Sequence, residues 1–438
     1  MNSAAAGADA RALAAQALQR IVAGQSLRAE FAAFSTKLPD ARDRALLSAL
    51  LHAGARWWLR YAVAVDRLLE RPLPAREAQL SALLVLGLVQ LETLHLPVYA
   101  SVAATVDAAR ALGKPKFAGL VNALLRRWLR ERDSVNSALD ADVATRTAHP
   151  RWLLDSLEAD WPDASVAIAD ANNAQAPLWL RTNRRRVGRD AFVQRLIAAG
   201  IDARASALLP DGLLLERSLD VTQLPGFADG LFSVQDGAAQ YAAGLLDLHD
   251  GQRVLDACAA PGGKSAHILE QADVHLLALD RDERRLPRVA ENLARLGLRG
   301  EMRGADATRP KSWWDGKPFD RILIDAPCSA TGIIRRQPDV KLHRRPGDVA
   351  LLAAGQTRLL NALWPLLAPG GRLVYATCSV LEAENGERIE RFVARHADAG
   401  RAPAGLSDWR AVRGGGVQNL PGESGMDGFY YAVLEKHR

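Results

Sequence analysis

The sequence predicts a helical front, a small α+β connector and a C-terminal α/β domain, and three patterns lead to this fold class. From about residue 236 onward, near-continuous apolar runs alternate with amphipathic helical patterns, as in a mostly parallel sheet covered by helices on both faces. Before about residue 136, apolar residues recur at steps of three and four, which indicates helices. Between these parts, one helical pattern gives way to short strand-like runs.

The helical front is expected over residues 1–140, as a bundle of helices. Its strongest helical patterns are ARALAAQALQRIVAG, RDRALLSALLHAGARWWLRYAVAVDRLLE and REAQLSALLVLGLVQLETL. The connector is expected over residues 141–235, where the run LWLRTN, the helical pattern DAFVQRLIAAGI and the run LLLER follow one another.

The α/β domain is expected over residues 236–438. Its predicted strands are RVLDACA, HLLALD, EMRGAD, FDRILIDA and RLVYATCS, and the predicted helices between them are KSAHILEQA, ERRLPRVAENLARLG and VALLAAGQTRLLNALWPLLA. In sheets of this kind, ligands bind at the carboxyl ends of the strands, where loops lead into helices. The functional site is therefore expected at those ends.

Composition argues against several classes of protein. No apolar run is long enough for a transmembrane helix. The N-terminus MNSAAAGADARALAAQ carries Asp9 and Arg11 and lacks the apolar core of a signal peptide. Cys258, Cys328 and Cys378 are far apart, with no C-x-x-C pair and no His at ligand spacing. Neither a disulfide framework nor a metal site is therefore expected, and the compartment is expected to be the reducing cytoplasm.

The net charge of +6 is by itself a weak indication of a polyanionic partner. Any one basic cluster is most simply a solvated face, but three of them favour RNA or DNA as the partner. The clusters are Arg126, Arg127, Arg130 and Arg132; Arg184, Arg185, Arg186 and Arg189; and Arg335, Arg336, Lys341, Arg344 and Arg345.

A glycine-rich turn follows the first predicted strand of the α/β domain, in DACAAPGGKSAHI. Gly262 and Gly263 allow backbone to approach a ligand, and the following helix offers free N–H groups to an anion. A P-loop is excluded because Cys258 stands where its first glycine would be and Pro261 interrupts the loop. The dinucleotide pattern G-x-G-x-x-G is also absent.

Acidic residues follow the next two predicted strands. Asp280 can accept both hydroxyls of a ribose, although it could equally be a helix N-cap, and Asp306 can accept from an adenine amino group. Successive strand ends that carry Gly-Gly, Asp and Asp fit a ligand with ribose, adenine and a charged tail but no phosphate. S-adenosylmethionine is such a ligand.

Two thiols end adjacent strands, since IDAPC delivers Asp325 and Cys328 and YATCS delivers Cys378. One buried thiol is most simply a small apolar residue, and Cys258 is interpreted in that way. The pair beside a carboxyl instead suits methylation of cytosine at carbon 5. A thiolate that adds at carbon 6 makes carbon 5 nucleophilic, the carboxyl holds N3, and the thiol is later eliminated. This chemistry requires a lowered thiol pKa and a raised carboxyl pKa.

Several motifs resemble those of the RNA cytosine-5 methyltransferases of the Nop2/NSUN/Sun type: DACAAPGGKS, ALDRDERRL, GADAT, IDAPCSATGIIRRQPDVK, GQTRLLNALWPLLAPGGRLVYATCSVLEAEN and GMDGFYYA. The stretch LFSVQDGAAQYAAGLL resembles the motif that opens their catalytic domain. The resemblance implies a Rossmann-like class I methyltransferase fold with a mostly parallel, seven-stranded sheet. The helical front is similar to the RNA-binding module of NusB.

The resemblance also implies roles for single residues. Cys378, in the Thr-Cys motif, matches the family's nucleophile, and Cys328, in the Pro-Cys motif, matches the thiol that assists release. DNA cytosine methyltransferases use a Pro-Cys nucleophile, so the presence of both motifs favours RNA. Lys264 matches a position that holds either the methionine carboxylate or the cytosine, and Asp325 also faces the base. The matched cofactor positions are Cys258, Ala259, Ala260, Pro261, Gly262, Gly263, Lys264, Asp280, Asp306 and Asp325.

The resemblance implies 16S ribosomal RNA as the partner and S-adenosylmethionine as the cofactor, with S-adenosylhomocysteine as the product and no metal. The target cytosine is expected in single-stranded or loop RNA, because it must be unstacked to meet both thiols. A monomer without a membrane or an obligate protein partner is expected. Two alternatives stay open: a non-catalytic RNA-binding or antitermination factor, and a cytosine methyltransferase that acts on transfer RNA or DNA.

Overall fold

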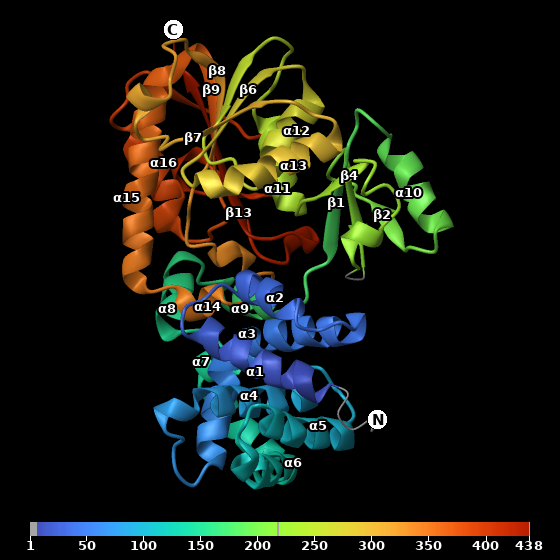
Figure 1. The fold of residues 1–438 in the computed structure, drawn as a ribbon. Helices are drawn as coiled ribbons and strands as arrows, with labels where there is room; N and C mark the ends of the chain where they lie inside the picture. The colour runs from blue at the N-terminus through green and yellow to red at the C-terminus, as the bar shows by residue number, and fades with distance from the viewer. Residues whose placement is uncertain (1–6, 217–218, 438) are drawn as a thin grey trace. The chain divides into compact units, whose positions relative to one another are not determined.

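The structure is a computed structural model that describes residues 7–216 and 219–437 (Figure 1). It divides into two compact units, one of Met1–Asn173 with Ile334–Arg345 and the other of Ala174–Ile333 with Pro346–Arg438. The helices between residues 143 and 173 thus belong to the same unit as the helical front. The division into three domains at residues 140 and 235 stays a prediction.

The first unit is an all-helical bundle, as the sequence predicts. Helix α4 is apolar on all sides and buried along most of its length, which makes it the central helix of the bundle. Within the described part of the chain, no helix combines the length and the apolar character needed to cross a membrane. The helices are α1 Ala8–Val22, α2 Leu27–Ser35, α3 Ala41–Leu68, α4 Ala78–Glu92, α5 Val98–Ala111, α6 Ala118–Asp140, α7 Val143–Thr147, α8 Arg151–Asp160, α9 Ser165–Asn173 and α14 Val340–His343.

The segment Ile334–Arg345 is part of this bundle, although it follows a strand of the α/β sheet in the sequence. Leu342 lies in the bundle core, and the Lys341 Nζ donates to the Asn173 Oδ1 at 2.8 Å. Burial lowers the pKa of the Lys341 amine well below its usual value. Lys341 and Arg335 are buried, so these two members of the third basic cluster do not belong to a solvated face.

The connector is a four-stranded antiparallel sheet in the order β2-β3-β1-β4, with α10 packed on it. Its core includes Leu180, Phe192 and Phe232, and the two phenylalanine rings stack with their centroids 5.3 Å apart. The strands and the helix predicted from LWLRTN, LLLER and DAFVQRLIAAGI are confirmed. Their bounds are β1 Leu178–Thr182, α10 Arg189–Ala198, β2 Ala203–Ala205, β3 Gly212–Leu215 and β4 Phe232–Val234.

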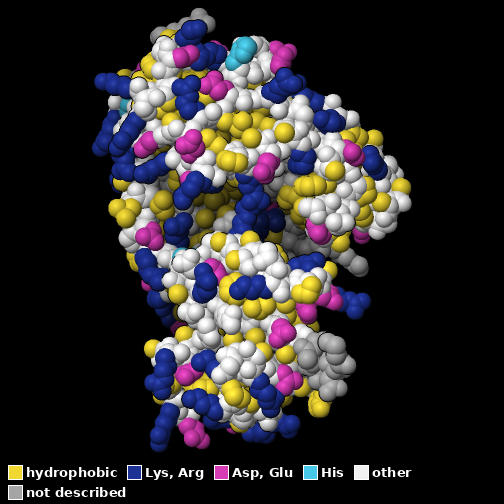
Figure 2. All heavy atoms as spheres, in the orientation of Figure 1, with side chains coloured by type: hydrophobic (Ala, Val, Ile, Leu, Met, Phe, Trp, Pro, Cys, Tyr) yellow, Lys and Arg dark blue, Asp and Glu magenta, His cyan; other side chains and the backbone are white. Residues whose placement is uncertain are grey.

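The second basic cluster is largely engaged within its own unit. The Arg184 guanidinium pairs with Asp211 at 2.7 Å, and the Arg186 Nε donates to the Leu296 carbonyl oxygen at 3.0 Å. In Figure 2, Lys and Arg side chains lie on the visible face of each unit, with Asp and Glu among them. A basic sequence cluster in this chain therefore does not by itself mark an RNA-binding surface.

The α/β sheet has the predicted parallel strands at its centre, in the order β9-β8-β5-β6-β7. Helices α11, α12 and α13 cover one face, and α15 and α16 cover the other. The bounds are β5 Arg253–Asp256, β6 His275–Asp280, β7 Glu301–Gly304, β8 Phe319–Asp325, β9 Leu367–Thr377, α11 Gly237–Leu245, α12 Gly263–Gln271, α13 Leu286–Leu296, α15 Pro346–Leu363 and α16 Gly386–Val393.

The sheet differs from the expected mostly parallel, seven-stranded arrangement. Within residues 7–216 and 219–437 it has nine strands, and every pairing made by the last four is antiparallel. Three of these are short and lack an alternating apolar pattern, so they depend on their neighbours more than on local preference. The last four strands are β10 Ala399–Ala402, β11 Arg410–Ala411, β12 Val417–Asn419 and β13 Phe429–Lys436.

One glycine lies at a close approach of the connector to helix α13. Gly230 has a φ of +67°, and a Cβ built on it would lie 2.1 Å from the backbone oxygen of Arg295 in α13. Both the left-handed backbone and the contact exclude a side chain at this position.

Replacement of Gly230 by alanine is expected to lower the free energy of unfolding by about 3 kcal/mol, from backbone strain and overpacking together. Gly200 is a matched control, since it has a φ of +77° but no atom within 4 Å of its Cβ position. Gly200→Ala should therefore cost only about 1 kcal/mol. Chemical denaturation of both variants measures the difference, and equal losses would contradict the argument.

Candidate active site

The carboxyl ends of the parallel strands meet at one edge of the sheet. In the pairing of β8 with β9, Asp325 lies opposite Ala376, so Cys378 follows the strand end beside Asp325. Strands β5 and β6 end at Asp256 and Asp280. The structure thus brings the acidic residues and a thiol predicted from the sequence to the same edge.

The loop between β5 and α12 depends on its glycines. Gly262 has a φ of +96°, and a Cβ built on it would lie 3.2 Å from the Val289 Cα. Gly263 begins α12, and a Cβ there would meet no atom within 4 Å. The loop therefore leaves open space beside the first turn of α12, where free N–H groups favour a negatively charged group.

Asp280 shapes this loop from the end of β6. It is buried, its Oδ2 accepts from the Ala260 N–H at 3.0 Å, and its Oδ1 accepts from the Asp282 N–H at 2.9 Å. The Arg285 guanidinium lies 3.3 Å from the same Oδ2. A carboxylate offers about four acceptor positions, so Asp280 keeps capacity for the hydroxyls of a ligand.

Asp306 lies beyond the end of β7 and is partly exposed. Its Oδ1 accepts from the Thr308 hydroxyl at 2.7 Å and from the Thr308 N–H at 3.0 Å. The hydrogen bond from the Thr308 hydroxyl, with that from the N–H, lowers the pKa of Asp306. Asp306 is therefore an ionised acceptor, and the adenine contact expected of it stays a prediction.

Asp256 joins α12 to the end of β5. It is fully buried, and its Oδ2 accepts from the Ser265 hydroxyl at 2.6 Å. Burial raises the pKa of Asp256 to about 6, although the Ser265 hydrogen bond opposes the rise.

Lys264 and Asp325 form an ion pair between α12 and β8. The Lys264 Nζ lies 2.7 Å from the Asp325 Oδ2 and 5.0 Å from the centre of the Phe429 ring. Burial is the largest single effect on the Lys264 ammonium and by itself would lower its pKa. The charge of Asp325 and its hydrogen bond, together with the charges of Cys378 and Asp256, outweigh burial, and the pKa is raised. Lys264 is thus a fixed cation at the edge of the sheet.

Cys328 and Cys378 lie together, with their sulfur atoms 3.4 Å apart. The hydrogen bond to Cys378 and burial raise the pKa of the Cys328 thiol well above its usual value. Cys328 is therefore protonated at neutral pH. Cys258 is held elsewhere, packed against the core with residues of β5 and β8, and burial raises its pKa as well.

The buried carboxylate of Glu384 connects the loops that carry the two thiols. Its Oε1 accepts from the Ser329 N–H at 2.9 Å and from the Gln356 Nε2 at 3.1 Å. Its Oε2 accepts from the hydroxyls of Ser329 and Ser379. Because Ser329 follows Cys328 and Ser379 follows Cys378, Glu384 fixes the positions of both cysteines.

A second set of contacts holds the loop of Cys378. Its carbonyl oxygen accepts from the Gly332 N–H at 2.9 Å, and the Gly332 carbonyl accepts from the Gly428 N–H at 2.8 Å. A Cβ on Gly332 would lie 2.2 Å from the Gly428 oxygen. The Thr377 hydroxyl donates to the Asn385 Oδ1 at 2.6 Å. These bonds leave the Cys378 backbone little freedom.

The sequence predicts which groups react, but it does not predict the residues that hold them in place. Glu384 lies in the motif LEAEN, close to Cys378 in the sequence but far from Cys328, and this second separation hides its contact with the Cys328 loop. Gly332 follows the Pro-Cys motif closely. The glycines in SATGI and GMDG are the sequence signal that could have indicated this close backbone contact. The structure brings four of the predicted cofactor positions together at the loop between β5 and α12. Gly262, Gly263 and Lys264 lie at its end, and Asp280 accepts a hydrogen bond from it.

Comparison with protein families matches three models to successive parts of the chain. Residues 8–130 match the NusB family, and residues 149–222 match the ferredoxin-like domain of the RsmF/B-like methyltransferases. Residues 243–435 match the family described as 16S rRNA methyltransferase RsmB/F.

Curated relatives resemble the whole chain. Ribosomal RNA small subunit methyltransferase B of Xylella fastidiosa (strain Temecula1) is 50% identical over 432 residues, which is 98% of each chain. The protein of the same name from Pseudomonas syringae pv. tomato is 47% identical over 97% of this chain and 96% of its own.

Solved structures support the fold. The crystal structure of PH0851 has a TM-score of 0.82 at 22% identity and covers 98% of this chain and 99% of its own. A methyltransferase homologue from Pyrococcus horikoshii has a TM-score of 0.57 at 27% identity, over 66% of this chain and 99% of its own. NSun6 from the same organism, solved with SFG, has a TM-score of 0.61 at 19% identity over 66% and 98%.

Replacement of Glu384 by alanine should loosen both cysteine loops, because several buried donors lose their common acceptor. We expect a loss of about 3 kcal/mol in the free energy of unfolding and faster alkylation of Cys328 and Cys378 by iodoacetamide. Glu387 is the control, since its carboxylate is partly exposed and pairs with Arg391 on the same helix. Glu387→Ala should cost below about 1 kcal/mol and leave the alkylation rates unchanged; similar behaviour of the two variants would disprove the role of Glu384.

Asp256 should make stability depend on pH. Its pKa of about 6 in the folded state, against a reference value of 3.8, means that the folded protein binds this proton more tightly than the unfolded chain. The stabilisation that this proton gives to the folded protein is complete below about pH 4, and it is lost as the pH rises through about 6. Asp256→Asn should therefore gain up to about 3 kcal/mol over the wild type between pH 4 and pH 8.

Melting temperatures measured across this pH range test the dependence on Asp256. The exposed Asp202→Asn variant reports the general effect of removing one carboxylate. A constant difference between Asp256→Asn and the wild type at every pH would refute the assignment.

Proposed function

Because the chain belongs to the ribosomal RNA small subunit methyltransferase B family, we propose that it methylates carbon 5 of a cytosine in 16S ribosomal RNA, cytosine 967, with S-adenosylmethionine. One observation carries the chemical part of the proposal. The sulfur atoms of Cys328 and Cys378 lie 3.4 Å apart, at the edge of the sheet where Lys264 pairs with Asp325.

The residues at the sheet edge fit the cofactor. The open space at Gly263 accommodates the methionine end, Asp280 keeps acceptor capacity for the ribose, and Asp306 offers an ionised oxygen to the adenine amino group. The other positions assigned to the cofactor are Cys258, Ala259, Ala260, Pro261, Gly262, Lys264 and Asp325. S-adenosylmethionine, when bound, supplies an electrophilic methyl group on a sulfonium centre.

Cys378 is assigned as the nucleophile. Its thiolate forms a bond to carbon 6 of the ring, the ring electrons shift towards N3, and N3, held by Asp325, takes a proton from the Lys264–Asp325 pair. Carbon 5 becomes nucleophilic and can accept the methyl group. The Lys264 ammonium attracts the negative charge of the attacking sulfur, because it is a fixed cation nearby.

Cys328 is assigned to release. Its raised pKa keeps it protonated, and its sulfur lies within reach of Cys378. As the bond between carbon 6 and Cys378 breaks, Cys328 gives its proton to the departing sulfur. In the same step the Cys328 sulfur takes the proton of carbon 5, whose bonding electrons restore the ring double bond, and N3 returns its proton to the Lys264–Asp325 pair. Both thiols are regenerated.

We assign the helical front, which matches the NusB family, to binding of the RNA partner. In the first basic cluster Arg126 and Arg130 are exposed, and we assign them to the RNA backbone. The cytosine must leave its stack to reach the thiols, so single-stranded or loop RNA is the proposed target. We place the protein with its substrate in the cytoplasm and propose that it acts as a monomer.

The three cysteines provide a matched set of variants. Cys378→Ala should abolish methyl transfer and form no covalent complex with RNA. Cys328→Ala should accumulate a covalent protein–RNA complex, because the first bond forms but is not broken. Cys258→Ala should retain transfer within about threefold, because the substitution keeps the backbone of the cofactor loop and the Cys258 side chain packs against the core. Denaturing gel electrophoresis of each variant with RNA and cofactor measures the complex.

A complex that persists in Cys378→Ala and is lost in Cys328→Ala would reverse the two roles. Tritium transfer from labelled cofactor to 16S RNA, transfer RNA and duplex DNA tests the substrate class. Transfer to DNA or transfer RNA alone would replace the proposed substrate. A wild-type protein that gives no heat with S-adenosylmethionine in calorimetry would instead be a non-catalytic RNA-binding factor.

A further inference from the structure

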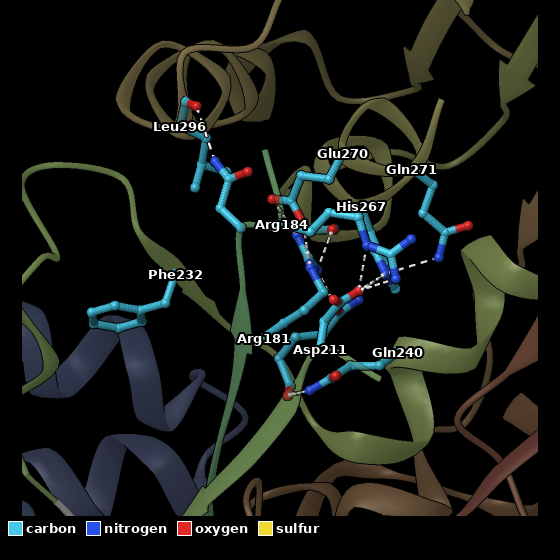
Figure 3. Close-up of polar contacts among 12 residues, drawn as sticks. Arg181, Arg184, Asp211, Phe232, Gln240, His267, Glu270, Gln271 and Leu296 are labelled. Carbon is cyan, nitrogen blue, oxygen red and sulfur yellow. Dashed lines mark hydrogen bonds and ion pairs between the residues drawn. The ribbon is translucent and has the colours of Figure 1, made fainter. Parts of the chain in front are cut away.

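Arg181 forms a buried ion pair that joins the connector to helix α12. It lies on β1, and its side chain is fully buried, as is that of its partner Glu270. The Arg181 Nε lies 2.8 Å from one oxygen of Glu270, and one of its terminal nitrogens lies 3.0 Å from the other. Figure 3 shows Arg181 reaching from its strand to Glu270 on the helix.

The same guanidinium also reaches the first residue of the helix. Its remaining terminal nitrogen donates to the Gly263 carbonyl oxygen at 3.1 Å and to the side-chain oxygen of Gln235. Helical side chains lean towards the N-terminus, which lets Glu270, in the last turn, meet a group placed beside the first. Arg181 therefore holds α12 near both of its ends.

The contact with Gly263 lies next to the cofactor loop. Gly262 precedes this residue at the left-handed turn, and Lys264 follows it and pairs with Asp325. In an α-helix, the carbonyl of residue 263 already accepts the N–H four residues further on. The bond from Arg181 is thus not needed to form the helix, and its effect is to fix the position of this peptide group.

Two further contacts hold the connector against helices α12 and α13. The Arg185 Nε donates to the Glu270 carbonyl oxygen at 3.3 Å, and the Asn183 Nδ2 donates to the Leu296 carbonyl oxygen at 3.2 Å. Burial, together with the charges of Arg181 and Arg184, lowers the pKa of His267 well below its usual value. His267 is therefore neutral and does not compete with Arg181 for Glu270.

We propose that Arg181 is a positioning residue, through which the connector sets the cofactor loop and Lys264 at their working distance from Asp325. The proposal rests on the methyltransferase function proposed above. It gives the connector a part in binding the cofactor, in addition to any part in binding RNA. Arg181 itself does not touch the reacting atoms.

The substitution Arg181→Lys tests the proposal in the full-length protein. Lysine can keep an ion pair with Glu270, but its single nitrogen cannot also hold Gly263 and Gln235. We expect S-adenosylhomocysteine to bind about tenfold more weakly in calorimetry, and the KM for S-adenosylmethionine to rise by a similar factor. The KM for RNA should stay within about twofold. The control Arg184→Lys, at a residue that pairs with Asp211, should leave all three values unchanged.

A double variant keeps the test decisive if Arg181→Lys does not fold. Arg181→Met combined with Glu270→Met removes both buried charges together, which an interior tolerates better than the loss of one partner. The same roughly tenfold loss of S-adenosylhomocysteine affinity is expected, because the Gly263 contact is again missing.

Binding of S-adenosylhomocysteine requires no RNA, so this inference and the proposed function can fail separately. Wild-type affinity in a folded Arg181→Lys protein, with or without a lower melting temperature, overturns the role of Arg181. If the wild type binds S-adenosylhomocysteine but methylates no cytosine, the proposed function fails. Weaker binding by the variant would in that case still support the positioning role.

Discussion

The parallel pairing of β8 with β9 is the constraint on which the candidate site depends. It places Asp325 opposite Ala376, so that the loops after these strands begin side by side. Two thiols fifty positions apart in the sequence can then lie with their sulfur atoms in contact distance. Without further support such loops would be mobile, since they are short polar segments at a sheet edge. The buried Glu384 supplies that support by accepting hydrogen bonds from both loops.

Much of this arrangement could be predicted from local patterns. Apolar runs such as that of β8 are long, are flanked by turn residues and alternate with amphipathic helices, so their type and order are readable. The carboxyl ends of parallel strands share one edge, and this rule alone brings Asp280 and Asp325 to the same place. The residues of the candidate site could therefore be named in advance, although the distances between them could not.

The supporting contacts could not be predicted, because they join distant parts of the chain. Arg181 reads as one more basic residue of a connector strand, and only the folded chain shows Glu270 beside it. Glu384 reads as a surface acid of a polar loop. The local charge pattern is also misleading at Lys341, which is buried. The short strands have no apolar pattern of their own: β10 and β12 form by pairing with β13, and β11 by pairing with β12. These residues serve long-range packing, on which sequence periodicity carries no information.

The course of the chain has a further consequence. Between the Pro-Cys and Thr-Cys motifs, the backbone leaves the unit that contains the sheet, contributes Ile334–Arg345 to the helical bundle, and returns at Pro346. A fragment cut at residue 174 would thus carry an orphan segment whose Leu342 and Lys341 have lost the surroundings that bury them. The two units are therefore interleaved along the chain, and no single cut between them leaves each unit with all of its own residues.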